Sequence, residues 1–158
     1  MNLPREGRLA DGVHSFPVHV YYEDTDAGGV VYYANYLKFA ERARSEAIRA
    51  LGASHGRLRD EVGIVLAVHK LTAEYLVPAR LDDELVVHTR VLGATGAAIE
   101  LEQQITRAQA RLFAMTCTVV CVAKSGRPTR LPPVLAAAVA QFSPQTSPTP
   151  KVIKANGR

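Results

Sequence analysis

The sequence predicts an α+β fold in which a curved five-stranded antiparallel sheet wraps around one long helix. Three observations lead to this prediction: one segment has the period of an amphipathic helix, several others alternate like strands, and their order is strand, helix and then four strands. One helix is too narrow to cover a flat sheet of five strands, so we expect the sheet to curl around it. The opposite face is then left for a partner chain to cover.

The first strand is expected within residues 14–23. Apolar side chains alternate there with mostly polar ones, at Phe16, Val18, Val20 and Tyr22. A period of two is typical of a half-buried strand. Pro17 lacks a backbone N–H, which favours an edge or the start of a strand. Residues 24–29, Asp-Thr-Asp-Ala-Gly-Gly, are turn formers and end the strand.

The long helix is expected over residues 33–51. Its apolar positions recur at steps of three and four, at Tyr36, Phe39, Ala40, Ala43, Ala47, Ile48 and Leu51. Basic side chains mostly occupy the other sides, which is the pattern of a helix that buries one face. Gly52 follows the last apolar position, as is typical of a helix C-terminus.

Four further strands are expected at residues 64–75, 84–92, 97–106 and 112–123. The last of them is apolar on both faces, which indicates a central strand. The connections around residues 93–96 and 108–110 are short enough for hairpins. We therefore expect the last four strands to be consecutive antiparallel neighbours, followed by a short Ala-rich helix from Pro132.

The 158 residues are enough for one domain. We expect a flexible N-terminus over residues 1–13, one domain over residues 14–142 and a disordered basic tail over residues 143–158, which is rich in Ser, Pro, Thr and Lys. All 15 Asp and Glu residues lie before residue 103, so the C-terminal third is basic. No aromatic residues interleave its basic ones, so nucleic-acid binding is not expected.

Several other functions are excluded by composition. No apolar run reaches the roughly 20 residues of a membrane helix, and the N-terminus lacks the apolar core of a secretion signal, so stable membrane insertion is not expected. Two cysteines, Cys117 and Cys121, cannot form a disulfide framework and are expected to be buried thiols in a cytoplasmic protein. The five histidines are scattered, so neither a metal site nor a cofactor is expected.

The candidate catalytic and ligand-binding residues lie mainly within residues 21–36. Two carboxylates, Asp24 and Asp26, stand at the exit of a strand, and Gly28 and Gly29 allow a ligand to approach the backbone closely. A helix follows, and its first N–H groups lack partners within the helix. A carboxylate opposite a helix N-terminus can serve acyl transfer as base or nucleophile, while the N–H polarises a carbonyl. The same residues also fit an ordinary turn and helix cap.

The string YYEDTDAGGVVYYANYLKFAERARSEAIRALG, residues 21–52, resembles the opening of hotdog-fold acyl-CoA thioesterases of the 4-hydroxybenzoyl-CoA thioesterase type. The nearest match is their Tol–Pal-associated branch, which a second block, VHKLTAEYLVPARLDDELVVHTRVLGATG, also resembles. The resemblance implies a hotdog fold, hydrolysis of acyl-CoA to a free acid and CoA, and sheets paired edge to edge in dimers that commonly join into tetramers. Active sites would lie at the dimer interface.

The resemblance also assigns residues. The family's catalytic aspartate falls on Asp26, and its carbonyl-polarising backbone N–H falls on Tyr33, where the branch usually has His. The backbone donor survives this change, whereas a phenol is a poor base at neutral pH. Gly28, Gly29, Val31 and Tyr32 are the expected substrate-binding residues. Whether Asp26 attacks the carbonyl or activates water stays open.

Alternatives remain for the function and for single residues. Asp24 is expected to hold the turn rather than to catalyse, and Glu41 and Glu46 to pair with neighbouring arginines on the helix surface. A non-catalytic acyl or CoA binding module is the main competing function. A dehydratase is a third, although the helix contains no His between residues 33 and 51. No motif ranks the cations that could hold the CoA phosphates: Arg90, Arg107, Arg111, Lys124, Arg127 and Arg130.

Overall fold

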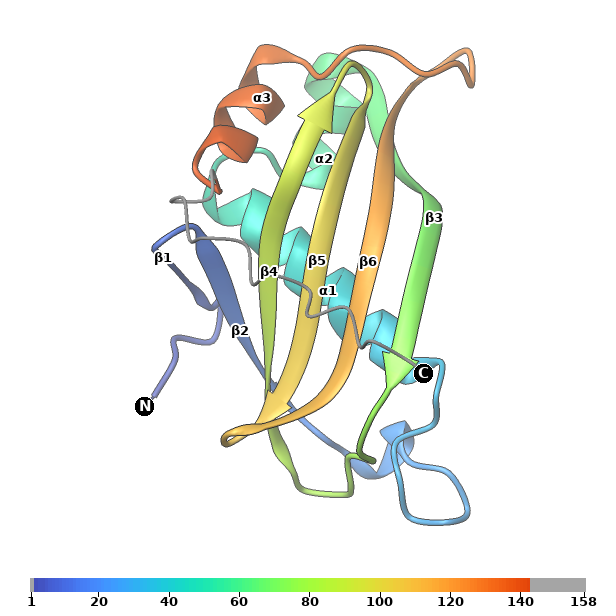
Figure 1. The fold of residues 1–158 in the computed structure, drawn as a ribbon. Helices are drawn as coiled ribbons and strands as arrows, with labels where there is room; N and C mark the ends of the chain where they lie inside the picture. The colour runs from blue at the N-terminus through green and yellow to red at the C-terminus, as the bar shows by residue number, and fades with distance from the viewer. Residues whose placement is uncertain (1, 143–158) are drawn as a thin grey trace, which may run out of the picture.

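A computed structural model describes residues 2–142 of the chain (Figure 1). Its sheet is antiparallel throughout, in the order β1-β2-β4-β5-β6-β3. The strands are β1 (Arg8–Ala10), β2 (Val13–His19), β3 (Ile64–Tyr75), β4 (Glu84–Thr95), β5 (Ala98–Arg107) and β6 (Ala110–Ala123). The helices are α1 (Asn35–Ala50), α2 (His55–Arg57) and α3 (Pro133–Ala140), with a 3₁₀ turn η1 (Tyr22–Asp24) and a π-helical turn η2 (Leu58–Val62). The α+β prediction is therefore confirmed.

The predicted number of five strands is wrong, because the sheet has six. Strand β1 pairs with β2 through a two-residue turn at Asp11 and Gly12, whose φ angles are 52° and 75°. Asp-Gly favours this kind of hairpin because both turn positions need positive φ. Residues 8–10 thus form a strand within the segment predicted as a flexible N-terminus. The predicted basic tail, residues 143–158, lies outside the described residues.

The predicted neighbours of β3 are also wrong. Tight turns at residues 96–97 and 108–109 join β4, β5 and β6 as consecutive neighbours, as expected. Strand β3, however, pairs along its length with β6, from Ile64 opposite Ala123 to Tyr75 opposite Phe113. The connection over residues 76–83 carries the chain from β3, at one edge of the sheet, past β6 and β5 to β4, as Figure 1 shows at the lower end of the molecule.

Helix α1 lies across one face of the curved sheet (Figure 1). It buries the face that its period predicts, including Tyr36, Phe39, Ala40, Ala43 and Ala47. It begins at Asn35, two residues later than expected, because Tyr32 to Ala34 form a turn in which the Asn35 N–H donates to the Tyr32 carbonyl at 2.8 Å. Gly52 follows its end with φ 81°, which confirms the predicted C-terminus.

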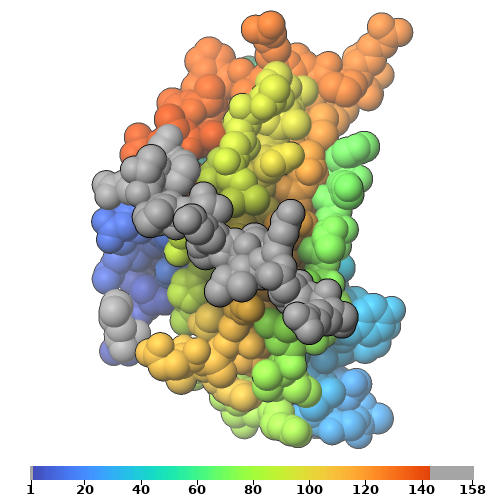
Figure 2. Space-filling model, viewed as in Figure 1, coloured from blue at the N-terminus to red at the C-terminus, as the bar shows by residue number. Residues whose placement is uncertain are grey.

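Strand β3 forms one margin of the sheet (Figure 2, green). Residues 67–72 are all exposed, and four apolar side chains of the strand are 40–49% exposed: Val65, Val68, Leu71 and Tyr75. A long edge strand with exposed apolar residues favours pairing with another chain. The short helix expected after Pro132 is present as α3 and buries Leu135 and Ala138.

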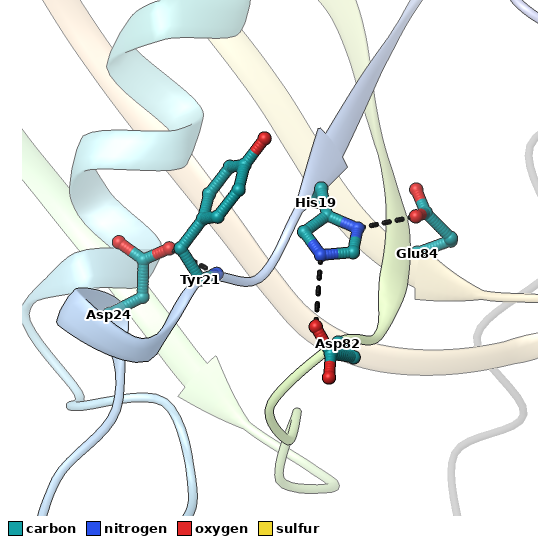
Figure 3. Close-up of polar contacts among 5 residues, drawn as sticks. All are labelled: His19, Tyr21, Asp24, Asp82 and Glu84. Atoms are coloured by element: carbon teal, nitrogen blue, oxygen red, sulfur yellow. Dashed lines mark hydrogen bonds and ion pairs between the residues drawn. The ribbon is translucent and has the colours of Figure 1, made fainter.

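A cluster of ion pairs lies at the C-terminal end of β2 (Figure 3). His19 lies between two carboxylates, one at the start of the neighbouring strand β4 and one just before it. Its Nδ1 contacts Glu84, and its Nε2 is 3.2 Å from Asp82 Oδ1. The hydrogen bond to Glu84, and secondarily that to Asp82, raises the pKa of His19 above its ordinary value.

We expect His19→Gln to destabilise the protein more at pH 6 than at pH 9. A histidine whose pKa is raised by folding contributes stability below its unfolded pKa, and this contribution is lost as pH rises through the folded pKa. Denaturant midpoints of both proteins at the two pH values measure the difference. His69→Gln, at an exposed position on β3, is the control. An equal effect of His19→Gln at both pH values would contradict the prediction.

Candidate functional site

Residues 25–31 form a loop that is held by its own backbone. The Asp26 N–H donates to the Val30 carbonyl at 2.8 Å, and the Gly29 N–H donates back to the Asp26 carbonyl at 3.1 Å. Gly29 has φ 76°, a conformation that glycine adopts without strain. Val31 fixes the loop to the rest of the chain, because its N–H donates to the Ala79 carbonyl at 2.8 Å.

The Asp26 carboxylate points into this loop with one oxygen. Its Oδ1 accepts from the Gly28 N–H at 2.8 Å and from the Val30 N–H at 3.4 Å. A Cβ at position 28 would lie 3.2 Å from the same oxygen, so a glycine gives it the most room there. Oδ2 has no hydrogen-bond partner among the described residues. Asp26 is exposed in the single chain, so its second oxygen is accessible to a ligand.

The backbone N–H of Tyr33 points out of the start of α1. The Tyr32 carbonyl accepts from Asn35, within the turn that opens the helix. In a trans peptide the C=O and N–H point in opposite directions, so the N–H of Tyr33 points away from the helix. Tyr33 lies one residue before the N-cap Ala34, and its side chain is 62% exposed.

Most other backbone donors near this position are already used. The N–H groups of Gly28, Gly29, Val31 and Tyr32, the expected substrate-binding residues, all donate within the chain: to Asp26 Oδ1 and to the carbonyls of Asp26, Ala79 and Asp24. Between residues 28 and 35, only the N–H groups of Tyr33 and Ala34 have no acceptor among the described residues. Val31 is also buried, whereas Gly28, Gly29 and Tyr32 are exposed.

Asp24 joins the end of β2 to the start of α1. Its Oδ2 accepts from the Tyr21 N–H at 2.9 Å (Figure 3), and its carbonyl accepts from the Tyr32 N–H and from Asn35 Nδ2, both at 2.9 Å. Asp24 and Asn35 are 7% and 9% exposed. Asp24 thus holds the turn, as expected. Asn35 was not singled out from the sequence, although a short polar side chain beside a turn often bonds to nearby backbone.

A group of packed aromatic residues supports the start of α1. Tyr36 stacks on Phe113 with ring centroids 5.3 Å apart, and Tyr75 packs edge-on against Phe113 at 5.1 Å. The Tyr36 hydroxyl accepts from the Ala79 N–H at 2.9 Å, and the Tyr75 hydroxyl donates to the Tyr33 carbonyl at 2.8 Å. Burial raises the pKa of Tyr36, which keeps its hydroxyl neutral. Sequence patterns showed no sign of the contact between Tyr75 and Tyr33, because 42 residues separate them.

We expect Tyr75→Phe to reduce turnover by up to about tenfold with little change in KM, because one hydrogen bond contributes about 0.5–1.5 kcal/mol. The change removes only the hydroxyl that fixes the Tyr33 carbonyl and leaves the ring to pack. Thiol release from an acyl-CoA measures kcat and KM. Tyr22→Phe, at an 82% exposed position, is the control. Unchanged kcat would show that this hydroxyl does not position Tyr33.

The remaining candidates have structural partners. Glu46 pairs with Arg49 at 2.6 Å, as expected, whereas Glu41 accepts from Ser45 rather than from an arginine. Of the candidate phosphate-binding cations, Arg107 pairs with Asp83 at 2.7 Å. Both cysteines are buried and reduced, and burial raises the pKa of each thiol. Residues 2–142 contain no group of His, Cys, Asp or Glu suited to a metal ion, and no helix in this range could span a membrane.

Comparison with known proteins decides the family. The model of the thioesterase-like superfamily matches residues 20–139, well over half of the chain, including the loop of Asp26 and all of α1. The chain belongs to the thioesterase-like superfamily. The resemblance to hotdog acyl-CoA thioesterases is confirmed.

Members of this superfamily with curated names are similar in sequence. The acyl-CoA thioesterase YbgC of Haemophilus influenzae is 47% identical over 114 residues, covering 72% of this chain and 84% of that protein. The acyl-CoA thioester hydrolase YbgC of Escherichia coli O157:H7 is 45% identical over 108 residues, covering 68% and 80%.

Solved structures agree on the fold. A probable thioesterase from Bartonella henselae has a TM-score of 0.74 at 34% identity, covering 76% of this chain and 99% of that one. A 1,4-dihydroxy-2-naphthoyl-CoA thioesterase from Synechocystis has a TM-score of 0.76 and covers 81% and 96%. At 21% identity the second likeness shows the fold alone.

Proposed function

We propose that this superfamily member hydrolyses acyl-CoA thioesters to a free carboxylic acid and CoA, with Asp26 as the catalytic carboxylate. The observation that carries the proposal is the pair of unused backbone donors, Tyr33 and Ala34, beside a loop that presents one unpaired oxygen of Asp26. The YbgC relatives named as acyl-CoA thioesterases support the reaction class.

The thioester carbonyl would accept a hydrogen bond from the Tyr33 N–H at the positive end of α1. One such donor, aimed at the oxyanion of the tetrahedral intermediate, stabilises it by about 3–4 kcal/mol. Gly28 and Gly29 would let the thioester approach the loop, and Val31 and Tyr32 would contribute through side chains or carbonyls, since their N–H groups are used.

Two routes use the same carboxylate. In one, Asp26 Oδ2 attacks the carbonyl carbon, the C–S bond breaks, CoA leaves as the thiolate, and water then hydrolyses the mixed anhydride. In the other, Asp26 accepts a proton from a water molecule that attacks the carbonyl directly. Hydrolysis in ¹⁸O-labelled water under single-turnover conditions separates them, because only the first route transfers an Asp26 oxygen to the product acid.

A second copy of the chain would complete the site. Strand β3 is an apolar edge, and Tyr75 on this strand bonds to Tyr33. We propose that β3 pairs with its copy in a cytoplasmic homodimer, or in a homotetramer built from two dimers, and that the partner covers the exposed Asp26. Sedimentation should show dimers or tetramers, and specific activity should fall when dilution produces monomers. Full activity of a monomer would contradict this assembly.

Thiol release from a panel of acyl-CoA and acyl-carrier-protein thioesters tests the function. We expect release of free thiol with at least one thioester, and the panel reports the preferred chain length and carrier. Tight binding of acyl-CoA without thiol release from any thioester would instead support the non-catalytic binding module.

A further inference from the structure

A cavity lies inside the fold, away from the loop of Asp26. It has a volume of about 150 Å³ and lies between the second half of α1, the sheet and α3. Its walls are mostly apolar and include Ile48 of α1, Ile99 and Leu101 of β5, Val119 of β6 and Ala138 of α3. An apolar cavity of about this volume holds one molecule of the size of benzene.

One wall of this cavity carries a cation. Arg44 of α1 lines it and donates from Nη1 to Gln103 Oε1 at 2.9 Å. The orientation of the Gln103 amide is fixed, because its Nε2 donates to the Ala40 carbonyl and to Thr89 Oγ1, both at 2.9 Å. Gln103 is fully buried and Thr89 is 2% exposed. The guanidinium is therefore held in place by a rigid buried network.

Arg44 has no direct ion-pair partner among the described residues. A guanidinium has five N–H donors, and the bond to Gln103 uses one. Within residues 2–142 no carboxylate lies within ion-pair distance of Arg44, and residues 143–158 contain no Asp or Glu. Glu41 and His55, at the rim, both bond to Ser45. Burial lowers the pKa of Arg44, since it disfavours the charged form, and the Coulomb interactions with Cys117 and Glu41 offset only part of this effect. An anion bound beside the guanidinium would offset this penalty.

The cavity is distinct from the site at Asp26. Arg44 lies nine residues after Asn35, which is about 14 Å along the helix axis. On the sheet, Val119 lies six residues after Phe113, or about 20 Å along β6. Phe39 and Phe113, which are fully buried and pack against Tyr36 near the start of α1, do not line this cavity.

We propose that this cavity binds a small monocarboxylic acid with an apolar body, such as an aromatic or branched acid, whose carboxylate pairs with Arg44. The apolar walls select the body of the ligand, and the guanidinium binds its carboxylate. This ligand is a free acid rather than a thioester, so the site goes beyond the proposed function.

Titration of the protein with benzoate tests the proposal, with binding measured by calorimetry and by amide NMR. The unaltered protein should bind benzoate at least tenfold more tightly than benzamide, its neutral analogue, with shifts concentrated around Arg44, Val119 and Ala138. Arg44→Met should weaken benzoate binding at least tenfold and leave benzamide unchanged. Arg42→Met, on the exposed side of the same helix, should bind like the unaltered protein.

Two further variants keep the result decisive. Ala138→Leu fills the cavity while Arg44 stays, and should lose benzoate binding even if Arg44→Met does not fold. Asp26→Asn should bind benzoate as the unaltered protein does. The proposal is wrong if the unaltered protein binds no benzoate at millimolar concentration, if Arg44→Met or Ala138→Leu folds and binds benzoate normally, or if Asp26→Asn abolishes binding.

Discussion

We expect Asp26→Asn to reduce turnover of acyl-CoA by about 100-fold or more without unfolding the protein. Asparagine retains an Oδ1 that can accept from the Gly28 and Val30 N–H groups, so the loop keeps its hydrogen bonds. It replaces the second carboxylate oxygen by an amide nitrogen, which can neither attack a carbonyl nor accept a proton from water. The loss should therefore fall on kcat, with KM little changed.

The matched control is Glu23→Gln, which neutralises an exposed carboxylate three residues earlier in the chain. It should retain the turnover of the unaltered protein, because Glu23 lies outside the loop. Thiol release measures both variants, and circular dichroism checks their fold. Normal turnover of a folded Asp26→Asn would remove Asp26 from the mechanism.

We expect Phe113→Ala to lower the free energy of unfolding by about 3–5 kcal/mol, because the change removes a fully buried ring and leaves a cavity. The effect should reach the candidate site. Phe113 packs against both Tyr36 and Tyr75, and these two residues bond to the Ala79 N–H and to the Tyr33 carbonyl. Turnover should therefore fall at temperatures where the variant is still folded.

Two controls separate the effect of the side-chain volume that is removed from the effect of its position in the fold. Phe113→Leu should destabilise less than Phe113→Ala, because a smaller cavity remains. Phe16→Ala removes a ring of the same size from a half-buried position on β2, and should change stability less and turnover not at all. Urea denaturation measures stability. Equal losses of stability and of turnover for Phe16→Ala and Phe113→Ala would contradict the prediction that the buried position of Phe113 matters.

Elements with strong periodicity were predicted well from the sequence. Helix α1 was expected over residues 33–51 and spans Asn35–Ala50, and β3 was expected at the residues where it occurs. The helix follows from apolar positions at steps of three and four, and the strand from a run rich in Val, Ile and Leu, so both depend on local sequence alone. The errors at the start of α1 came from a turn, Tyr32 to Ala34, that has no periodic pattern.

The pairing of the strands was predicted less well, because it depends on contacts between distant residues. β3 and β4 are neighbours in sequence, yet β3 pairs with β6. A short strand such as β1 is too brief for alternation to show, although the Asp11-Gly12 turn is a local signal for it. Periodicity identifies strands but does not order them.

The candidate site combines residues that the family resemblance assigns with others that it does not. Asp26 and Tyr33 come from the resemblance, and their proposed roles await the experiments above. Asn35 and Tyr75 position the same segment through hydrogen bonds that span 11 and 42 residues. A motif read along the chain does not reveal such contacts, because they join residues that are separated in the sequence and meet only in the folded structure.

The order of the strands sets the sequence of events when the chain is made on a ribosome. β3 is synthesised before its partner, and 34 residues, Leu76 to Gln109, must follow before the first residue of β6 is added. Until then β3 lacks β6, its one hydrogen-bonding neighbour in the chain, and its valines and leucines are open to other nascent chains. Closure of the sheet is thus a late, non-local step, and the newly made protein is most prone to aggregation just before it.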